Sequence, residues 1–221
     1  MLVETIAAWF FLACLMVFFL INVYNILLHK PVDKASPHAK VDNPCGAILG
    51  LVALGTTAYF VEATFYPLLV LANLASFLRV FTFAVSNMLM TYAQILGLLL
   101  TAFGYSLFLW SVIARGKYAT SRTMRGNHRL VTWGPYRYVR NPSYTAYFAM
   151  FTGLFAVWPS LLSLIPLVGI PGYFSVTFQE EKLLERHCGE EYLKYQTKTG
   201  RFFPKLKVRV EEEQEHRRVP P

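Results

Sequence analysis

A polar segment between two apolar stretches carries the first side chains that could do chemistry. Residues 115–140 hold six arginines, one lysine and no acid, and histidine, tyrosine and asparagine stand among them or just beyond. Gly134-Pro135 is typical of a turn, and Asn141-Pro142-Ser143 is typical of a helix start, where proline is tolerated. The free N–H groups of a helix start favour an anion, so the segment predicts a binding site for a polar ligand.

A second cluster follows the last apolar run of the chain, which ends at residue 179. Glu180 and Glu181 are adjacent there. Two carboxylates beside an apolar segment are costly unless they are hydrated or paired. Either they pair with nearby arginines, or one of them faces a cationic group of a ligand. Arg140 and Glu181 are our candidates for orienting a substrate and placing charge in a reaction.

The composition is that of an integral membrane protein. Of 221 residues, 55% are hydrophobic and only 15% are charged, against about 25% charged in soluble domains. The mean hydropathy is +0.38. This excludes a disordered chain and disfavours a soluble domain. Three widely spaced cysteines, Cys14, Cys45 and Cys188, predict neither a disulfide framework nor a metal site.

Charge-free runs locate the elements that must position the two clusters. They cover residues 5–29, 43–61, 63–78, 80–114 and 141–179. A membrane span needs about 20 apolar residues. The first run therefore predicts one helix, and the fourth predicts one helix over about 87–114.

The last charge-free run is too long for one helix and is interrupted at Trp158-Pro159-Ser160. Because proline breaks a helix, this run predicts a tight hairpin of two short helices, roughly 143–157 and 160–178. The charged and apolar residues that follow predict an amphipathic helix along the membrane surface, with a break at Gly189.

Residues 43–81 allow one helix plus a connector interrupted by Pro67, or two spans. Cytoplasmic loops carry excess lysine and arginine. With five spans, the basic residues before position 41 share one side with segment 115–140 and the C-terminal tail, while Glu4, Glu62 and Arg79 lie opposite. We therefore predict an all-α integral membrane protein of about five transmembrane helices, with the C-terminal hairpin and the amphipathic helix, N-terminus outside and C-terminus in the cytoplasm.

The predicted organisation has three parts. Residues 1–114 hold three transmembrane helices, 115–207 hold the ligand-binding loop, hairpin and cytoplasmic helices, and 208–221 form a charged tail, expected to be disordered. The first apolar run lacks a basic flank and a cleavage site, so we do not expect a signal peptide. Attraction to anionic lipid explains much of the basic segment, and no nucleic-acid-binding module accompanies it.

Ordered motifs connect the two clusters. They are His128-x-Leu-Val-Thr-x-Gly-x-Tyr136, Arg140-Asn-Pro-Ser-Tyr144, Glu180-Glu-x-x-Leu184, Gly189-Glu-Glu-Tyr192 and Lys198-Thr-Gly-Arg-Phe-Phe-Pro204. This pattern resembles the isoprenylcysteine carboxyl methyltransferase family and the related phospholipid N-methyltransferases. The resemblance implies a membrane-embedded enzyme that uses S-adenosylmethionine.

The resemblance also implies which residues bind that cofactor: His128, Leu130, Val131, Tyr136, Asn141, Pro142, Ser143, Tyr144 and Glu180. Family members often have histidine where this chain has Asn141. The prenylcysteine enzymes place a substrate-binding arginine four residues before the first glutamate, where this chain has Val176. An arginine at position 176 would pair with the carboxylate of a prenylcysteine acceptor, so Val176 bears on which molecule is methylated.

The leading hypothesis is methyl transfer from S-adenosylmethionine to a lipid-like or prenylated acceptor, as in isoprenylcysteine carboxyl methyltransferases. The site would face the cytoplasm from the endoplasmic reticulum or, in a prokaryote, the plasma membrane. A phospholipid or other small-acceptor methyltransferase is the first alternative. An NADPH-dependent sterol reductase and a non-catalytic lipid-binding membrane protein are the others.

Aromatic residues of the hairpin would suit the apolar tail of a lipid-like acceptor: Phe148, Phe151, Phe155, Tyr173 and Phe174. The terminal Val219-Pro220-Pro221 lacks a prenylation signal, so we do not expect the protein to be its own substrate.

Overall fold

A computed structural model describes residues 2–28, 39–40, 45–116, 123–124 and 130–205. The helices are α1 (Leu2–Leu28), α2 (Gly46–Leu71), α3 (Ala75–Arg79), α4 (Asn87–Arg115), the 3-10 helix η2 (Gly134–Arg137), α5 (Pro142–Val157), α6 (Ile165–Cys188) and α7 (Glu190–Lys198). Two short strands, β1 (Ala39–Lys40) and β2 (Thr123–Met124), pair antiparallel, with Ala39 opposite Met124.

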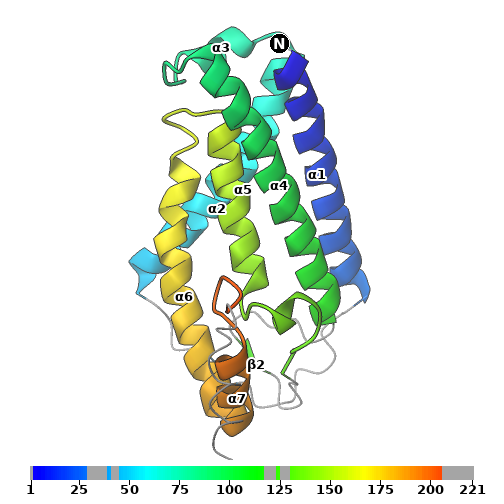
Figure 1. Cartoon of the computed structure of the whole chain (residues 1–221), viewed down its shortest axis with the longest axis vertical. Coiled ribbons are helices and arrows are strands. Elements are labelled where there is room, and N and C mark those ends of the chain that lie inside the picture. Colours follow the sequence, from blue (N-terminus) through cyan, green and yellow to red (C-terminus); the bar gives the residue numbers. More distant parts are fainter. Residues whose placement is uncertain (1, 29–38, 41–44, 117–122, 125–129, 206–221) are drawn as a thin grey trace, which may run out of the picture.

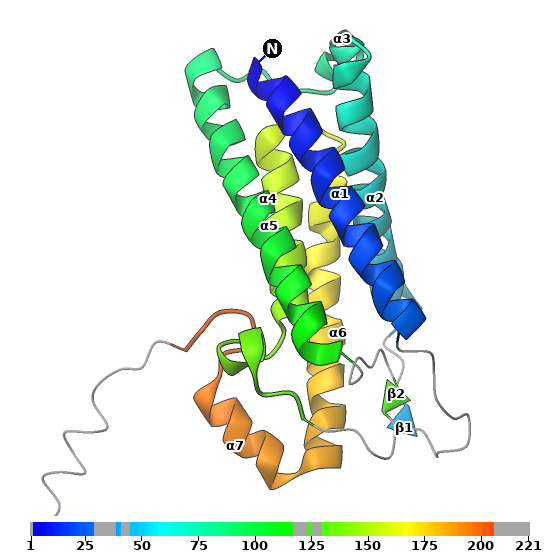
Figure 2. The same ribbon diagram turned by 90° about the vertical axis from the view of Figure 1, so that its right-hand side faces the viewer.

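The long helices α1, α2, α4, α5 and α6 form a bundle, with α3 at one end and α7 at the other (Figures 1 and 2). α4 packs against α5, α2 packs against α6, and α1 lies against α2 and α4. Among the described residues, three helical stretches are long and apolar enough to cross a membrane: Val3–Tyr24, Gly46–Leu71 and Asn87–Arg115. The all-α integral membrane fold is thus confirmed, while the number of spans and their orientation stay predictions.

Within residues 43–81, the chain forms one long helix followed by a connector, and not two spans. Helix α2 runs without interruption through Glu62 and Pro67, and only the short α3 follows as a connector. Glu62 therefore lies inside one continuous helix and not between two spans. It is 8% exposed on the inward face of α2, together with Tyr59 and Tyr66, because these positions recur at helical spacing.

The C-terminal hairpin differs from its prediction in its second helix. α5 agrees with the expected range, whereas α6 begins at Ile165 and continues to Cys188. No helix breaker stands between Phe178 and Cys188, and glutamate, lysine and leucine favour helix there. The first half of the predicted surface helix is thus the extension of α6. Gly189 ends α6 at a φ of +53°, and α7 starts at the next residue.

The hairpin is also less tight than predicted, since each of its helices packs mainly on a different neighbour. Glycines explain these pairings. A Cβ added at Gly97 on α4 would lie 2.6 Å from the carbonyl oxygen of Gly153 on α5. A Cβ at Gly55 on α2 would lie 2.7 Å from the Cα of Gly169 on α6. Small residues allow such close approach of helices in membranes.

The close approach of α4 and α5 can be tested with Gly97→Ala. The added methyl would meet the Gly153 carbonyl and Val157, and such overpacking costs about 1–3 kcal/mol. Gly50→Ala on α2 is the matched control, because nothing lies within 4 Å of its added Cβ and alanine favours helix by about 1 kcal/mol. Thermal unfolding in detergent should show a loss of stability only for Gly97→Ala. Equal behaviour of both variants would contradict the packing of α4 on α5.

Candidate functional site

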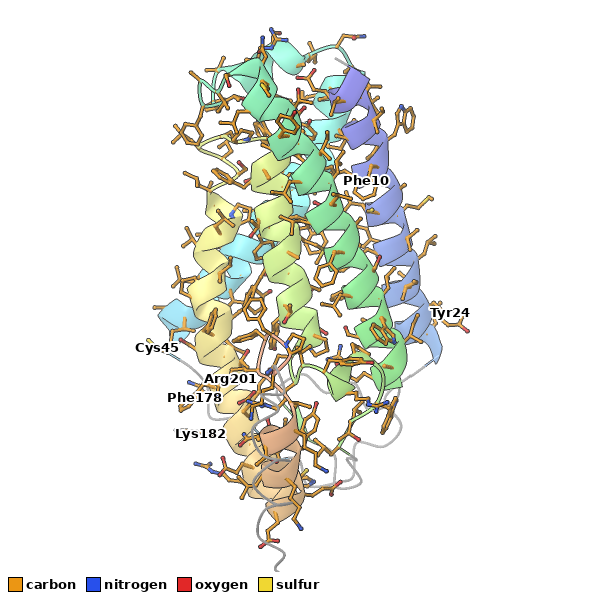
Figure 3. All side chains as sticks on the ribbon, viewed as in Figure 1. Phe10, Tyr24, Cys45, Phe178, Lys182 and Arg201 are labelled. Atoms are coloured by element: carbon orange, nitrogen blue, oxygen red, sulfur yellow. The ribbon has the colours of Figure 1, made fainter. Side chains whose placement is uncertain are left out.

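The two predicted clusters meet at the end of the bundle where α4 ends, α5 begins and α6 extends beyond its neighbours (Figure 1). Arg201, from the segment after α7, lies there near Phe178 and Lys182 of α6 (Figure 3). The Arg201 guanidinium is 5.7 Å from the centre of the Phe178 ring, and the Lys182 amino group is 4.5 Å from it. Segments that are far apart in sequence therefore build one site.

A buried carboxylate holds this end of the molecule together. Glu181 is 3% exposed. Its Oε1 accepts hydrogen bonds from Arg140 Nε at 3.1 Å and from Asn141 Nδ2 at 2.9 Å. Its Oε2 accepts from Arg201 Nε at 3.0 Å, and Arg201 Nη2 lies 2.9 Å away. A carboxylate with two arginines and an amide around it satisfies the condition under which burial of a charge is tolerated.

The backbone reinforces this network. Val139 and Gly200 form a parallel bridge. The N–H of Arg140 donates to the Gly200 carbonyl at 2.8 Å, and the N–H of Asn141 donates to the Arg201 carbonyl at 3.1 Å. Arg140 Nη1 also donates to the Thr199 carbonyl at 2.5 Å. The segment after α7 is thereby fixed beside the start of α5.

Glu180 takes a different place from its neighbour. The Tyr144 hydroxyl donates to both of its carboxylate oxygens, at 3.0 Å and 2.9 Å. Beside it, the hydroxyls of Ser143 and Ser111 are 2.8 Å apart, which ties α5 to α4. The two glutamates therefore have different roles, because Glu181 joins segments of the protein whereas Glu180 is hydrogen-bonded to Tyr144 of α5.

The apolar residues predicted for the cofactor lie close by. Leu130 packs against Tyr192 and Tyr195, and Val131 is 8% exposed. The Tyr195 hydroxyl donates to the Tyr136 carbonyl at 2.6 Å. Burial raises the pKa of Tyr195, so it serves as a neutral donor. Pro142 is buried at the first position of α5, and His128 lies outside the described residues.

Two arginines of the site had no assigned role in the sequence. Arg201 stands inside the quoted motif 198–204, but only the structure shows that it pairs with Glu181. Arg115, the last residue of α4, acts electrostatically on Tyr144 and Tyr147. Its buried Nε has no hydrogen-bond partner among the described residues. Its position directly after the charge-free run 80–114 was the available signal.

Aromatic side chains fill the space between α5 and α6. Phe148 stacks on Phe174 with ring centres 5.5 Å apart, and Phe202 lies 4.5 Å from Phe174. Tyr173 lies 5.0 Å from Tyr144. Phe155 is separate, 6.5 Å from Phe83 near the other end of α5. Four of the five predicted tail-binding residues thus contact one another: Phe148, Phe151, Tyr173 and Phe174. A role in holding a tail stays a prediction.

Comparisons with known proteins agree with the motifs. Residues 92–191 match the phospholipid methyltransferase family. No curated protein sequence matches the chain. The fold is similar to that of a eukaryotic intramembrane Ras methyltransferase, isoprenylcysteine carboxyl methyltransferase, with a TM-score of 0.52 and 18% identity. That similarity covers 88% of this chain and 64% of the other. The resemblance predicted from the sequence is confirmed.

The Glu181 network predicts a strong dependence of stability on one carboxylate. Glu181→Gln leaves Arg140 and Arg201 close together without their counter-charge, and breaking a buried pair costs about 3–5 kcal/mol. The control is Glu190→Gln, because its pair with Lys194 is 3.9 Å long and exposed. Denaturant unfolding in detergent should separate the two variants clearly. Similar small losses would mean that the network does not hold this end of the protein.

Proposed function

We propose that this protein transfers a methyl group from S-adenosylmethionine to a lipid-like acceptor, in the manner of isoprenylcysteine carboxyl methyltransferases. The observation that carries the proposal is the match of residues 92–191 to a methyltransferase family. The matched range includes Tyr144 with its partner Glu180, and Arg115, whose buried Nε has no hydrogen-bond partner among the described residues.

The residues around Tyr144 fit the amino-acid part of S-adenosylmethionine, which carries an ammonium and a carboxylate. Glu180 offers a carboxylate oriented by the Tyr144 hydroxyl, suited to the cationic end. Arg115 offers a guanidinium whose buried Nε lacks a partner among the described residues, suited to the carboxylate. The N–H groups of Ser143 and Tyr144, in the first turn of α5, have no partner within that helix and favour the same anionic group.

Methyl transfer depends more on alignment of the methyl donor with the acceptor than on acid and base groups. S-adenosylmethionine, when bound, supplies a methyl group already activated on a sulfonium. The protein then contributes orientation and exclusion of water. Arg140 and Glu181, our candidates for substrate orientation, contact each other directly. We therefore propose that they act as positioning residues, which hold Asn141 and the start of α5 in place.

The hydrogen bonds that Glu181 already accepts favour an acceptor that is ionised when it binds. A carboxylate acceptor needs no base, whereas an amine must lose a proton before it is methylated. Glu181 is an unsuitable base, since both of its oxygens already accept hydrogen bonds from cationic or amide groups. This supports a carboxyl acceptor over an amine acceptor.

Two observations favour the alternative, a phospholipid N-methyltransferase. The matched family is described by that activity. In addition, Val176 on α6 is 7% exposed and stands where the prenylcysteine enzymes have a substrate-binding arginine. In the carboxyl-methyltransferase proposal, another cation must therefore hold the acceptor's carboxylate. Arg137, exposed at the end of η2, is available for it.

The cofactor assignment is tested by Glu180→Gln. The substitution keeps the shape of the side chain and removes its charge, and the loss of a hydrogen bond to a charged group costs about 1.5–3 kcal/mol of binding energy. Affinity for S-adenosylmethionine, measured by calorimetry on the purified protein, should fall accordingly. Glu190→Gln on the exposed face of α7 should leave that affinity unchanged. If both variants bind equally well, Glu180 is not a cofactor ligand.

The acceptor is tested with labelled S-adenosylmethionine and a panel of prenylcysteine, phosphatidylethanolamine and thiol compounds. We expect methylation of prenylcysteine by the unmodified protein. If Arg137 holds the acceptor's carboxylate, Arg137→Gln should raise the KM for prenylcysteine without changing cofactor affinity, and Val176→Arg should add little. Methylation of phosphatidylethanolamine alone would establish the alternative. Activity on prenylcysteine that appears only in Val176→Arg would show that the native acceptor has no such carboxylate.

A further inference from the structure

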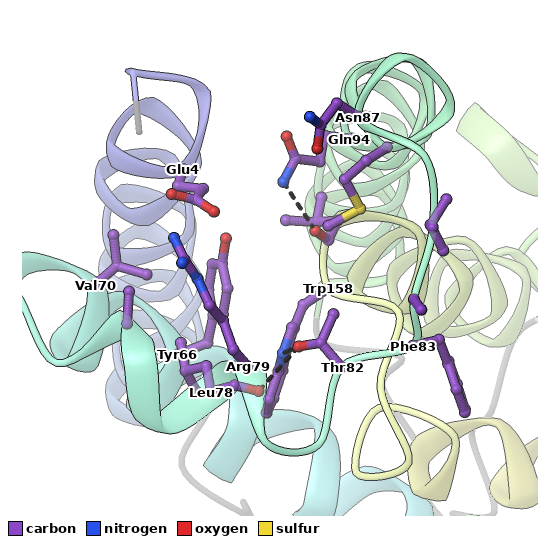
Figure 4. Close-up of a pocket in the computed structure, with 15 residues that line it drawn as sticks. Glu4, Tyr66, Val70, Leu78, Arg79, Thr82, Phe83, Asn87, Gln94 and Trp158 are labelled. Carbon is purple, nitrogen blue, oxygen red and sulfur yellow. Dashed lines mark hydrogen bonds between the residues drawn. The ribbon is translucent and has the colours of Figure 1, made fainter.

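A cavity of about 440 Å³ lies at the end of the bundle opposite the site just described. Its walls come from the first turn of α1, the end of α2, α3 with the chain that follows it, the start of α4 and the end of α5 (Figure 4). The two sites are separated by the length of α5, about 22 Å at 1.5 Å per residue. A volume of this size is typical of a small-ligand pocket.

Polar atoms with unused hydrogen-bonding capacity line this cavity. Tyr66 is 3% exposed, and its hydroxyl has no hydrogen-bond partner in the part of the chain that the structure describes. Its ring stacks on Trp158 with centres 5.7 Å apart, and the hydroxyl points between Glu4 and Arg79 (Figure 4). Gln94 is 6% exposed, and its amide donates a long hydrogen bond of 3.5 Å to the Val157 carbonyl. Buried donors without a good partner are costly, so a bound acceptor would resolve the deficit.

The charged residues of the cavity have opposite signs and come from different elements. Glu4 belongs to the first turn of α1, and Arg79 is the last residue of α3. Together with the Tyr66 hydroxyl and the Gln94 amide, Arg79 suits a phosphate group. Glu4 suits an ammonium group. The set of charges thus matches a zwitterion that carries both.

The surroundings indicate that the zwitterion belongs to a lipid. The candidate spans of α1 and α4 begin at Val3 and Asn87, beside residues that line the cavity. Large apolar side chains on the nearby chain point outward: Leu74 is 52% exposed, Phe77 61% and Val80 76%. Exposed apolar side chains on the same segment as Ala75, Leu78 and Arg79 of the cavity wall suit a molecule with a charged headgroup and acyl chains.

We propose that this cavity is a second binding site, which holds the headgroup of a zwitterionic phospholipid in the leaflet opposite the proposed methyl-transfer site. Arg79, Tyr66 and Gln94 bind the phosphate, and Glu4 faces the amine. The proposal does not rest on methyl transfer, since it concerns binding at the other end of the bundle.

Binding is measured on the delipidated full-length protein in detergent, with dioleoyl-phosphatidylethanolamine as the probe. The lipid should raise the Tm and bind at least tenfold more tightly than dioleoylglycerol, which lacks the phosphate. Free phosphoethanolamine, which shares the headgroup chemistry, should bind at least tenfold more weakly than the lipid. Equal binding of dioleoylglycerol would overturn the headgroup site, and equal binding of phosphoethanolamine would overturn the lipid as its source.

Tyr66→Phe and Arg79→Gln should each weaken binding of the phosphatidylethanolamine about fivefold to tenfold. Tyr92→Phe and Arg186→Gln are matched controls, because both side chains are exposed and neither lines the cavity, and these variants should bind as the unmodified protein does. Because the Tyr66 hydroxyl has no hydrogen-bond partner among the described residues, Tyr66→Phe should leave the lipid-free Tm unchanged. A fall in that Tm, or unchanged lipid binding in both test variants, would overturn the proposal.

Discussion

The carboxylate of Glu181 is the constraint on which the functional end of the molecule depends. It is buried at the point where α6 extends beyond the bundle, so water cannot hydrate the charged group there. Arg140, Asn141 and Arg201 supply the donors. These partners belong to the entry of α5 and to the chain after α7. One charge therefore decides where three segments meet, and Glu180 is presented to Tyr144 as a consequence of that meeting.

Glycine and aromatic residues divide the rest of the scaffold into two kinds of contact. Where α4 meets α5 and α2 meets α6, glycines bring the backbones together, and no side chain could be enlarged there without displacing a helix. Between α5 and α6, rings such as Phe148 and Phe174 keep the helices apart. Aromatic side chains can change rotamer, whereas a backbone contact cannot yield. The bundle thus combines a rigid pairing of helices with an adaptable space beside the reactive end.

Much of this arrangement could be predicted from the sequence because its signals are local. Charge-free runs located α1, α4 and α5, and Pro142 marked a helix start. The sequence left open whether Glu62 stands inside one helix or between two spans, because a charge inside an apolar run has the same appearance as a charge at its end. The sequence could not show that Arg140 and Arg201 both bind Glu181, since contacts between side chains from distant segments leave no periodic pattern in the sequence. The cavity around Tyr66 was hidden for the same reason, as its walls come from five separate segments.

The parallel bridge between Val139 and Gly200 also bears on the order in which the molecule assembles. Its two sides are about sixty residues apart in the chain, so closing this loop carries an entropic cost that no local helix formation offsets. The bundle can form before this bridge does, and the bridge can open while the bundle persists. We therefore expect the backbone amides of residues 199–202 to exchange with solvent faster than those of α4 and α5. A ligand at Tyr144 and Glu180 would slow the opening of the bridge.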